Sequence, residues 1–265
     1  MIKSIALHSY KGGTGRTTLS ANIAAILAQR GYDVVLLDMD TWAPSLHTIF
    51  RVESPKYFVG QYLSEELDYQ ELLIDMSSAL GLKGKLHLGV ANQDIDIIQE
   101  YTSKDREWHK KALSRILHLR DALQKDGFDI LIFDLASGAQ PSTVNAIVSS
   151  DHVLNICKVD NFDLNGTVQL NEKLYRPLDK TVSYLLNKIP RPLLNSMETT
   201  IVNTVKNSFG SDADILGYFV YSPEVAMTMG VEVHAISKPE IDFVSDLKII
   251  ANKLLLNLGK NEGGN

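Results

Sequence analysis

The chain has 265 residues, of which 45% are apolar and 22% charged, so it can bury one large core. Its formal net charge of −6 argues against a protein whose whole surface coats nucleic acid, and a single cysteine, Cys157, excludes an internal disulfide. The N-terminus lacks the pattern of a signal peptide, and no apolar run approaches the roughly 18 residues that span a bilayer. We therefore expect a cytoplasmic protein with a single domain over residues 1–258.

Short runs rich in β-branched and large apolar residues alternate along the chain with longer amphipathic stretches. This alternation is typical of βαβ units and predicts an α/β fold, a doubly wound and mostly parallel sheet flanked by helices. The expected strands are 5–9, 33–38, 86–91, 129–134, 151–157, 181–187 and 215–220. The expected helices are 17–30, 108–124, 140–149, 165–175, 196–209 and 241–258. Residues 51–82 are less regular, with short amphipathic segments at 63–67 and 71–80, and residues 259–265 are expected to form a disordered tail.

The loop after the first expected strand carries the sequence KGGTGRT at residues 11–17. Its three glycines allow the chain to curl so that several backbone N–H groups point inward, and the following helix adds the positive end of its dipole. A phosphate group is the ligand that fits, and a glycine-rich turn without a ligand is the alternative. The ordinary phosphate-loop pattern does not match, because Tyr10 stands at its first glycine and Arg16 at its lysine.

Acidic residues follow two of the expected strands at the edge of the sheet where ligands bind. Asp38 and Asp40 end the second strand two residues apart, so both carboxylates lie on one face of the sheet while the chain stays extended. Asp134 ends an apolar strand, where a buried carboxylate needs a partner such as a hydrated cation. A carboxylate in a turn without a ligand is the alternative for each of them.

Together these motifs resemble those of the MinD/ParA superfamily, whose deviant phosphate loop is written KGGxGKTT and is matched here except at Arg16. LLDMD at 36–40 resembles the second family motif, DILIFDLASG at 129–138 the Walker B and switch region, and LLNKIP at 185–190 and GYFVYSPEV at 217–225 the two nucleoside-binding segments. The resemblance implies an ATPase that binds ATP and Mg²⁺, forms a homodimer in the ATP-bound state, and uses slow hydrolysis as a timer to position or partition a cargo. The family switch usually contains a proline, which this chain lacks, so we expect a loop of different stiffness.

The resemblance also implies roles for the residues at matching positions. Thr17 binds Mg²⁺, Asp38 and Asp134 support the ion through its water shell, and Asp40 orients the attacking water. Lys11 reaches the phosphates of the partner subunit, although an exposed loop lysine is the alternative. The residues expected to hold the nucleotide are Gly12, Gly13, Thr14, Gly15, Arg16, Thr17, Thr18, Asn187, Lys188, Pro223 and Glu224. Among them, the Asn187 amide suits the edge of adenine, and a turn-forming role is its alternative.

Arg16 leaves the function open between three hypotheses. Arginine keeps the positive charge and can fork onto phosphate oxygens, so it is counted with Lys11 and Asp40 as a catalytic residue, but it is bulkier and aimed differently from lysine. The first hypothesis is a slow ATPase, and the second is a scaffold in which Arg16 locks the ATP dimer without hydrolysis. The third, a metabolic transferase or synthetase with the same loop, needs a second substrate pocket, which residues 41–127 do not indicate.

Partners are less well indicated by the sequence. The stretch WHKKALSRILHLR at 108–120 predicts a basic amphipathic helix that could meet DNA phosphates, although such a run is usually a solvated helix face. Apolar residues at Phe243, Leu247, Ile250 and Leu254 predict a C-terminal helix that packs on the sheet. The tail after it lacks the apolar face needed for membrane docking. The sequence indicates neither the cargo nor the protein partner that activates the enzyme or is recruited by it.

Overall fold

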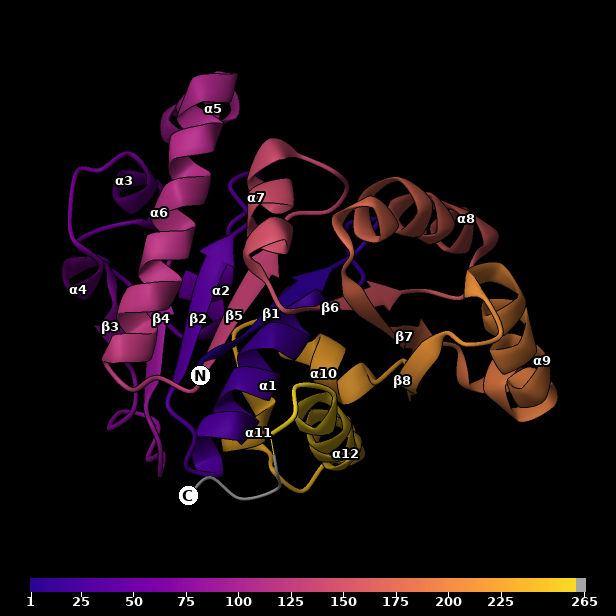
Figure 1. Cartoon of the computed structure of the whole chain (residues 1–265). Coiled ribbons are helices and arrows are strands. Elements are labelled where there is room, and N and C mark those ends of the chain that lie inside the picture. Colours follow the sequence, from indigo (N-terminus) through magenta and orange to yellow (C-terminus); the bar gives the residue numbers. More distant parts are fainter. Residues whose placement is uncertain (261–265) are drawn as a thin grey trace.

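The computed structural model describes residues 1–260, and for residues 194–202 it describes the backbone alone. Its centre is an eight-stranded sheet in the order β3-β4-β2-β5-β1-β6-β7-β8 (Figure 1). The strands are β1 Lys3–His8, β2 Val34–Met39, β3 Ile74–Asp75, β4 Leu86–Gly89, β5 Ile130–Leu135, β6 His152–Cys157, β7 Thr181–Ile189 and β8 Asp214–Val220. All neighbouring strands are parallel except β3, which pairs with β4 in the antiparallel direction.

Helices cover both faces of this sheet, as expected when crossovers connect parallel strands (Figure 1). The α-helices are α1 Arg16–Gln29, α2 Leu46–Ile49, α3 Val59–Leu63, α4 Tyr69–Leu72, α5 Ile95–Thr102, α6 Arg106–Lys125, α7 Pro141–Ser149, α8 Asn161–Leu170, α9 Arg191–Phe209, α10 Pro223–Met227, α11 His234–Ser237 and α12 Asp242–Asn257. A π-helix, η1 Asn171–Tyr175, and a 3₁₀ turn, η2 Arg176–Leu178, continue α8 toward β7. The predicted α/β fold with a single domain is therefore confirmed.

The core consists of two main layers, one on each side of the sheet. Successive residues of β1 face opposite layers: Ile5 and Leu7 pack with α1 and α12, whereas Ala6 packs with α6 and α7. The apolar residues predicted for the C-terminal helix are buried in the first of these layers. None of the described helices is long and apolar enough to cross a membrane.

The seven predicted strands are present, with ends that differ by one or two residues. We expected an amphipathic segment at 71–80, but the structure has the short edge strand β3 within it. The predicted helix 165–175 begins earlier, at Asn161, because the Asp160 side chain accepts a hydrogen bond from the Asp163 N–H and caps the helix there. Lys260, which falls in the predicted tail, pairs with Asp129 at 2.9 Å, and residues 261–265 of that tail lie outside the described residues.

The sheet places the candidate site at the carboxyl ends of its central strands. β1 lies between β5 and β6, and the chain runs from β1 through α1 to β2 on the far side of β5. The first crossover therefore leaves a crevice above β1, which is where ligands bind in open α/β sheets. The loops that follow β1, β2 and β5 line one cavity there, and the end of β7 and the segment after β8 line a second cavity beside the start of α1.

Candidate functional site

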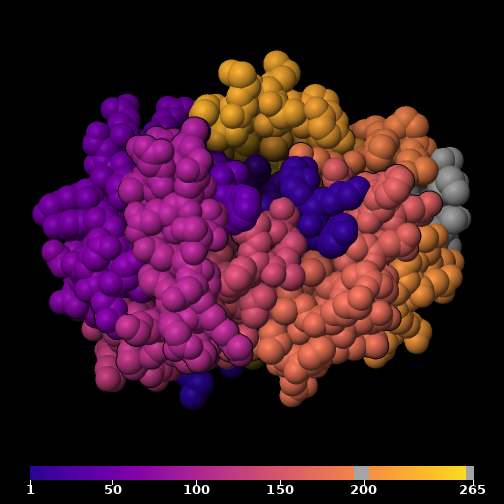
Figure 2. Space-filling view, turned by 90° about the horizontal axis from the view of Figure 1, so that it is seen from above, coloured from indigo at the N-terminus to yellow at the C-terminus, as the bar shows by residue number. Residues whose placement is uncertain are grey.

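The glycine-rich loop leaves β1 at Ser9 and enters α1 at Arg16. Gly13 and Gly15 have φ angles of 72° and 94°, in the left-handed region that favours glycine. A Cβ atom at Gly15 would lie 2.6 Å from the Asn187 amide nitrogen, so no larger residue fits without movement there. Seen from the carboxyl ends of the strands, the indigo N-terminal segment lies in a hollow between the gold and salmon segments (Figure 2). The loop therefore presents its backbone to an open cleft.

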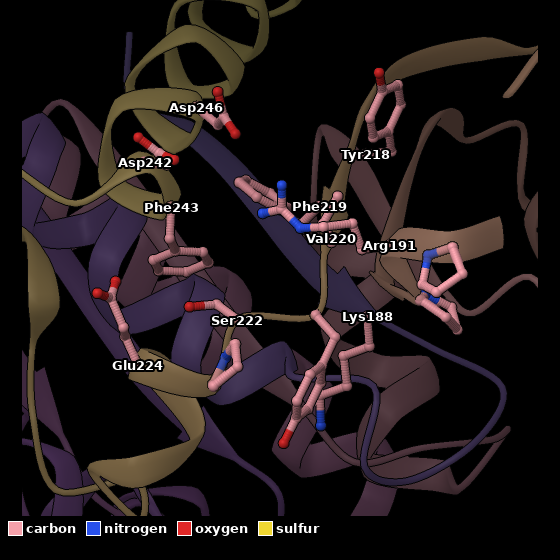
Figure 3. Close-up of a pocket in the computed structure, with 14 residues that line it drawn as sticks. Lys188, Arg191, Tyr218, Phe219, Val220, Ser222, Glu224, Asp242, Phe243 and Asp246 are labelled. Atoms are coloured by element: carbon pink, nitrogen blue, oxygen red, sulfur yellow. The ribbon is translucent and has the colours of Figure 1, made fainter. Parts of the chain in front are cut away.

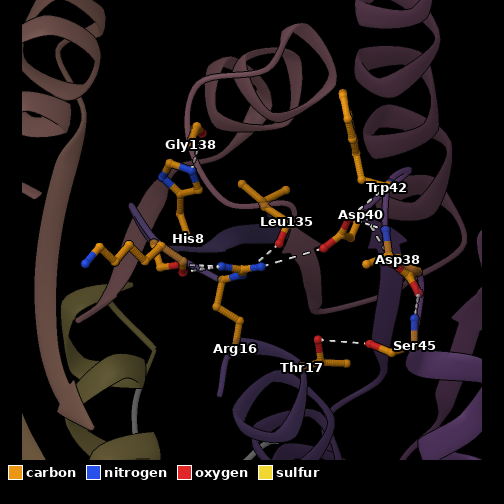
Figure 4. A network of polar contacts seen from close by, with 12 residues as sticks. His8, Arg16, Thr17, Asp38, Asp40, Trp42, Ser45, Leu135 and Gly138 are labelled. Atoms are coloured by element: carbon orange, nitrogen blue, oxygen red, sulfur yellow. Dashed lines mark hydrogen bonds and ion pairs between the residues drawn. The ribbon is translucent and has the colours of Figure 1, made fainter. Parts of the chain in front are cut away.

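Arg16 is only 8% exposed, and each of its three guanidinium nitrogens has a partner within the protein (Figure 4). Nε donates to the Leu135 carbonyl at 2.8 Å, and one terminal nitrogen donates to the Lys11 carbonyl at 3.1 Å and to the Ser9 hydroxyl. The other terminal nitrogen lies 3.6 Å from the Asp40 carboxylate. The fork that was expected to meet phosphate is therefore bound to groups at the ends of β1, β2 and β5.

Asp38 and Asp40 bind different parts of the segment that follows β2, which ends one residue after Asp38. One Asp38 oxygen accepts from the Asp40 N–H, and the other accepts from the N–H groups of Ser45 and Leu46, where α2 begins. Asp40 accepts from the Trp42 N–H at 3.1 Å and faces Arg16 (Figure 4). The condition of an extended chain ends at Met39, so the strand geometry no longer determines the direction of the Asp40 side chain.

Asp134 is fully buried and lies beside Asp38 in the register of β5 and β2. Neither of its oxygens has a well-formed hydrogen bond among the described residues, although the hydroxyls of Thr17 and Ser20 are near enough to lower its pKa. Burial outweighs these hydroxyls and raises the pKa of Asp134 to about 7. Burial and the neighbouring Asp134 carboxylate likewise raise the pKa of Asp38 well above its usual range. Both shifts reflect the cost of ionising the pair in this buried position, a cost that a nearby cation would offset.

This environment fits Mg²⁺ held largely by water and phosphate oxygens. The Thr17 hydroxyl, at the start of α1, accepts a hydrogen bond from the Ser45 hydroxyl at 3.3 Å and faces the same cavity as the loop. No cluster of three or more His, Cys, Asp or Glu side chains suited to a metal lies in the part of the chain that the structure describes. Mg²⁺ in phosphate-binding sites keeps several water ligands, so one hydroxyl and two carboxylates behind the water shell form a suitable protein contribution.

A cavity of about 280 Å³ lies over the loop and receives residues from three strand ends. Its walls include Trp42 from the loop after β2 and Ser137 and Gln140 from the loop after β5. The Gln140 Oε1 atom is buried without a hydrogen-bond partner among the described residues. None of these three residues was predicted to belong to the site. Their place in the segments that follow predicted strands was the only feature of the sequence that indicated them. The other wall residues are Gly12, Gly13, Arg16, Thr17, Asp40, Ala43 and Ala136.

A second cavity, of about 390 Å³, extends from Gly15 and Thr18 to the segment after β8. Asn187 lines it, but its amide nitrogen donates to the Thr14 carbonyl at 2.7 Å and its oxygen accepts from the Lys188 N–H at 2.8 Å. Lys188 has a left-handed φ of 58°, and its ammonium donates to the Gly13 carbonyl at 2.8 Å. Both predicted base-binding residues therefore also hold the glycine-rich loop in place.

Pro223 and Glu224 line a different and larger cavity, of about 850 Å³, which lies beyond the segment 220–222 (Figure 3). The two cavities share five wall residues, Lys188, Val220, Tyr221, Ser222 and Phe243. The wall of the smaller cavity includes Val220, the last residue of β8, and the two residues after it, Tyr221 and Ser222, none of which is among the predicted site residues. Pro223 and Glu224 therefore share a cavity with Lys188, whereas the predicted residues Gly15, Thr18 and Asn187 line the smaller cavity without them.

Lys11 lies beside the loop, with its side chain 39% exposed. Its ammonium lies 3.7 Å from the Asp160 carboxylate and 4.9 Å from the centre of the Phe162 ring, both at the start of α8. These exposed contacts are weak, so they leave the ammonium available to a partner that offers stronger ones.

The basic helix predicted at 108–120 is part of α6, and two of its arginines point into the protein. Arg115 donates to the carbonyls of Tyr62 and Leu67, and Arg120 pairs with Asp151 at 2.7 Å. These two cations stabilise the fold, which leaves fewer for a nucleic-acid surface than the sequence suggested.

Comparisons with known proteins fit this geometry. A family model described as an AAA domain matches residues 2–186. The chain belongs to the MinD/ParA family of P-loop ATPases. It is 25% identical over 199 residues to the Methanocaldococcus jannaschii protein MJECL24, with 69% of this chain and 72% of that protein covered. It is 27% identical over 171 residues to the chromosome-partitioning ATPase Soj of Thermus thermophilus, with 64% of this chain and 60% of that protein covered.

One of the similar solved structures is a MinD protein with bound nucleotide. MinD of Pyrococcus horikoshii, complexed with Mg-ADP, matches with a TM-score of 0.74 and 17% identity, covering 96% of each chain. At this identity the likeness shows the fold alone. The matched segment of this MinD/ParA-family chain spans less than two thirds of Soj, so the activity and partners of the whole protein are considered next as proposals.

Proposed function

We propose that this chain is an ATP-dependent, dimerising ATPase of MinD/ParA type, in which slow hydrolysis times the positioning or partitioning of a cellular cargo. The observation that carries the proposal is Asp134, a buried carboxylate without a well-formed hydrogen bond among the described residues, next to Thr17 at the mouth of the glycine-rich loop. Such a carboxylate favours a cation in the adjacent cavity, and the loop favours the phosphates that would accompany it.

The proposed reaction uses each strand-end group in a separate role. The amides of residues 12–17 hold the triphosphate. Thr18 lines the second cavity, which would take the rest of the nucleotide. Mg²⁺, when bound, offsets the charge of the β- and γ-phosphates, and Thr17 would hold it with Asp38 and Asp134 behind its waters. Asp40 orients the water that attacks the γ-phosphorus as the bond to the ADP oxygen breaks.

Dimerisation is proposed for the face that carries the cleft. Lys11 is exposed there and held only by weak contacts, so it can exchange its partners for phosphates of a second subunit. Exposed apolar side chains at Trp42, Phe162 and Tyr221 border the same loops and favour burial against another protein surface. The ATP-bound dimer is also proposed to bind a protein that activates it or is recruited by it, and no residues are assigned to that contact.

A non-hydrolysing scaffold is the second candidate, and the contact of Arg16 with Asp40 favours it. While Arg16 stays 3.6 Å from that carboxylate, Asp40 is drawn toward the arginine and away from a role with water. Nucleotide binding could then close the dimer without leading to hydrolysis. The two candidates differ in whether ATP releases Asp40 from Arg16.

Phosphate release from Mg-ATP, measured for the wild type and Arg16→Lys side by side, tests both candidates. Slow release by the wild type, with similar or faster release by the lysine variant, supports the ATPase. If the wild type binds ATP and releases no phosphate while Arg16→Lys does, the scaffold is supported. Thr17→Ala is the control that should be inactive in either background. Release by neither protein would refute the proposed ATPase.

A further inference from the structure

The loop after β5 is attached to the end of β1 by two hydrogen bonds. The Gly138 N–H donates to the Ser9 carbonyl at 3.0 Å, and His8 Nε2 lies 2.7 Å from the Gly138 carbonyl oxygen. The His8 ring is fully buried and points at Gly138 (Figure 4). On either side of Gly138, the same loop contributes Ser137 and Gln140 to the cavity over the phosphate loop.

The direction of the hydrogen bonds around His8 follows from its surroundings. A carbonyl oxygen only accepts, so Nε2 carries the hydrogen that is donated to Gly138. Burial lowers the pKa of His8 to about 3, which keeps the ring neutral and leaves Nδ1 as an acceptor. The Tyr175 hydroxyl donates to Nδ1, and the Tyr175 oxygen accepts from the Asn155 amide at 2.8 Å. One chain of directed bonds therefore runs from Asn155 to Gly138.

This chain of bonds reaches an unusual turn of helix. Tyr175 is the last residue of the π-helix η1, and single π turns are frequently found at functional positions. Its ring is fully buried and meets the His8 ring edge-on, with the centres 5.8 Å apart. The histidine is thus fixed by packing as well as by hydrogen bonds on both ring nitrogens.

We infer that His8 is a positioning residue of the nucleotide site, which, with Tyr175 and Asn155 behind it, holds the loop 136–140 against the phosphate loop. The inference rests on the proposed function and deepens it, because the loop lines the cavity for the reacting end of the triphosphate. A proline restricts a loop by fixing its own φ angle. This chain has no proline at 135–139, and the side-chain bond from β1 restricts the loop instead.

Amide hydrogen exchange of the nucleotide-free full chain tests the inference without depending on hydrolysis. Tyr175→Phe keeps the ring and removes only the hydroxyl that orients His8. Tyr62→Phe is the matched control, because the Tyr62 hydroxyl donates to the Arg115 carbonyl at 2.9 Å between α3 and α6. We expect residues 136–140 to exchange about fivefold to tenfold faster in Tyr175→Phe, as the loss of one buried hydrogen bond implies, and at the wild-type rate in the control. Unchanged exchange in Tyr175→Phe would overturn the inference.

Two substitutions of His8 test the geometry directly. Glutamine places its amide nitrogen near the position of Nε2, whereas the asparagine amide reaches only about as far as Nδ1. His8→Gln should therefore keep the slow exchange of residues 136–140, and His8→Asn should speed it up about as much as Tyr175→Phe. Equal acceleration in both variants would show that the bond to Gly138 does not position the loop.

Turnover provides the readout that a merely structural role would not change. If the wild type hydrolyses ATP, Tyr175→Phe should lower kcat about tenfold and leave KM within about twofold, because the loop contributes to the reacting end of the substrate. An unchanged kcat, or an equal loss of kcat and ATP affinity, contradicts the positioning role. If the wild type shows no turnover, the proposed ATPase fails, and the exchange experiment still decides the role of His8.

Discussion

Replacing Arg16 by lysine is expected to lower the stability of the nucleotide-free protein by about 2–3 kcal/mol. The guanidinium donates to the buried Leu135 carbonyl, the buried Ser9 hydroxyl and the part-buried Lys11 carbonyl, and it faces Asp40 at 3.6 Å. A lysine ammonium is a compact charge without the planar spread of a guanidinium, so it can bind only some of these acceptors at once. Two charge-assisted hydrogen bonds are then lost at about 1.5 kcal/mol each, the low end of the range for charged groups, and the remaining contacts of the ammonium offset part of this loss.

Thermal unfolding without nucleotide and with EDTA measures this loss. For a domain of this size, 2–3 kcal/mol corresponds to a decrease in Tm of about 5–10 °C. Arg51→Lys is the control, because Arg51 is exposed and its Nε donates to the Val231 carbonyl at 3.2 Å, so its Tm should change by less than about 2 °C. If Arg16→Lys changes the Tm no more than the control does, the strand ends do not hold Arg16 in solution and the reasoning is refuted.

The same pair of proteins shows whether ATP releases Arg16. Bonds that stabilise the nucleotide-free arrangement oppose any movement of Arg16 toward a phosphate, so they weaken ATP binding in the wild type if that movement is required. Saturating Mg-ATP should then raise the Tm of Arg16→Lys more than that of the wild type, since ligand stabilisation grows with affinity. Equal increases would show that Arg16 keeps its strand-end partners when ATP is bound.

Three further outcomes follow from the site and the core. Lys11→Ala should abolish ATP-dependent dimerisation, and a variant that still dimerises with Mg-ATP in light scattering would contradict the exchanged lysine. Because burial raises the pKa of Asp134 from 3.8 to about 7, its ionisation removes stability as the pH rises through this range, by roughly 3 kcal/mol between pH 5 and pH 8 at 1.36 kcal/mol per unit, and Asp134→Asn should remove this loss in urea unfolding at these two pH values. Ser183→Ala should destabilise the fold by about 1–3 kcal/mol and leave ATP affinity unchanged, because the Ser183 hydroxyl donates to Asp214 and accepts from His152 at the amino ends of the strands, away from the cleft.

The strands could be predicted because most of them are buried on both faces and carry continuous apolar runs. β5, for example, is buried at all of its residues from Ile130 to Leu135. The edge strand β3 has two residues and one exposed side chain, so it leaves no such run in the sequence. The early start of α8 depends on a single capping side chain, Asp160, within a stretch of weak periodicity.

The position of the site could also be predicted, whereas the partners of its side chains could not. Glycine spacing and strand-end acids place the loop, Asp38 and Asp134 at one edge of the sheet, because parallel strands end together. Hydrogen-bond partners depend on distances between segments far apart in the sequence. The Asn187 amide meets the Thr14 carbonyl across 173 positions, and His8 meets Gly138 across 130. Neither contact has a local pattern that would reveal it.

Two departures from the family pattern act on the same part of the molecule. Arginine in place of the loop lysine ties the start of α1 to Ser9 and Leu135, and the switch without a proline is tied to His8 and Ser9. The first set links α1 to the ends of β1 and β5, and the second links the end of β1 to the loop after β5, so both lie beside the phosphate loop. A nucleotide that draws Arg16 toward its phosphates must therefore break the hydrogen bond from Arg16 to the Leu135 carbonyl, three residues before the Gly138 contact. Arg16→Lys should then speed up amide exchange at residues 136–140 as well as altering turnover, and an effect on turnover alone would show that the two sets of bonds act independently.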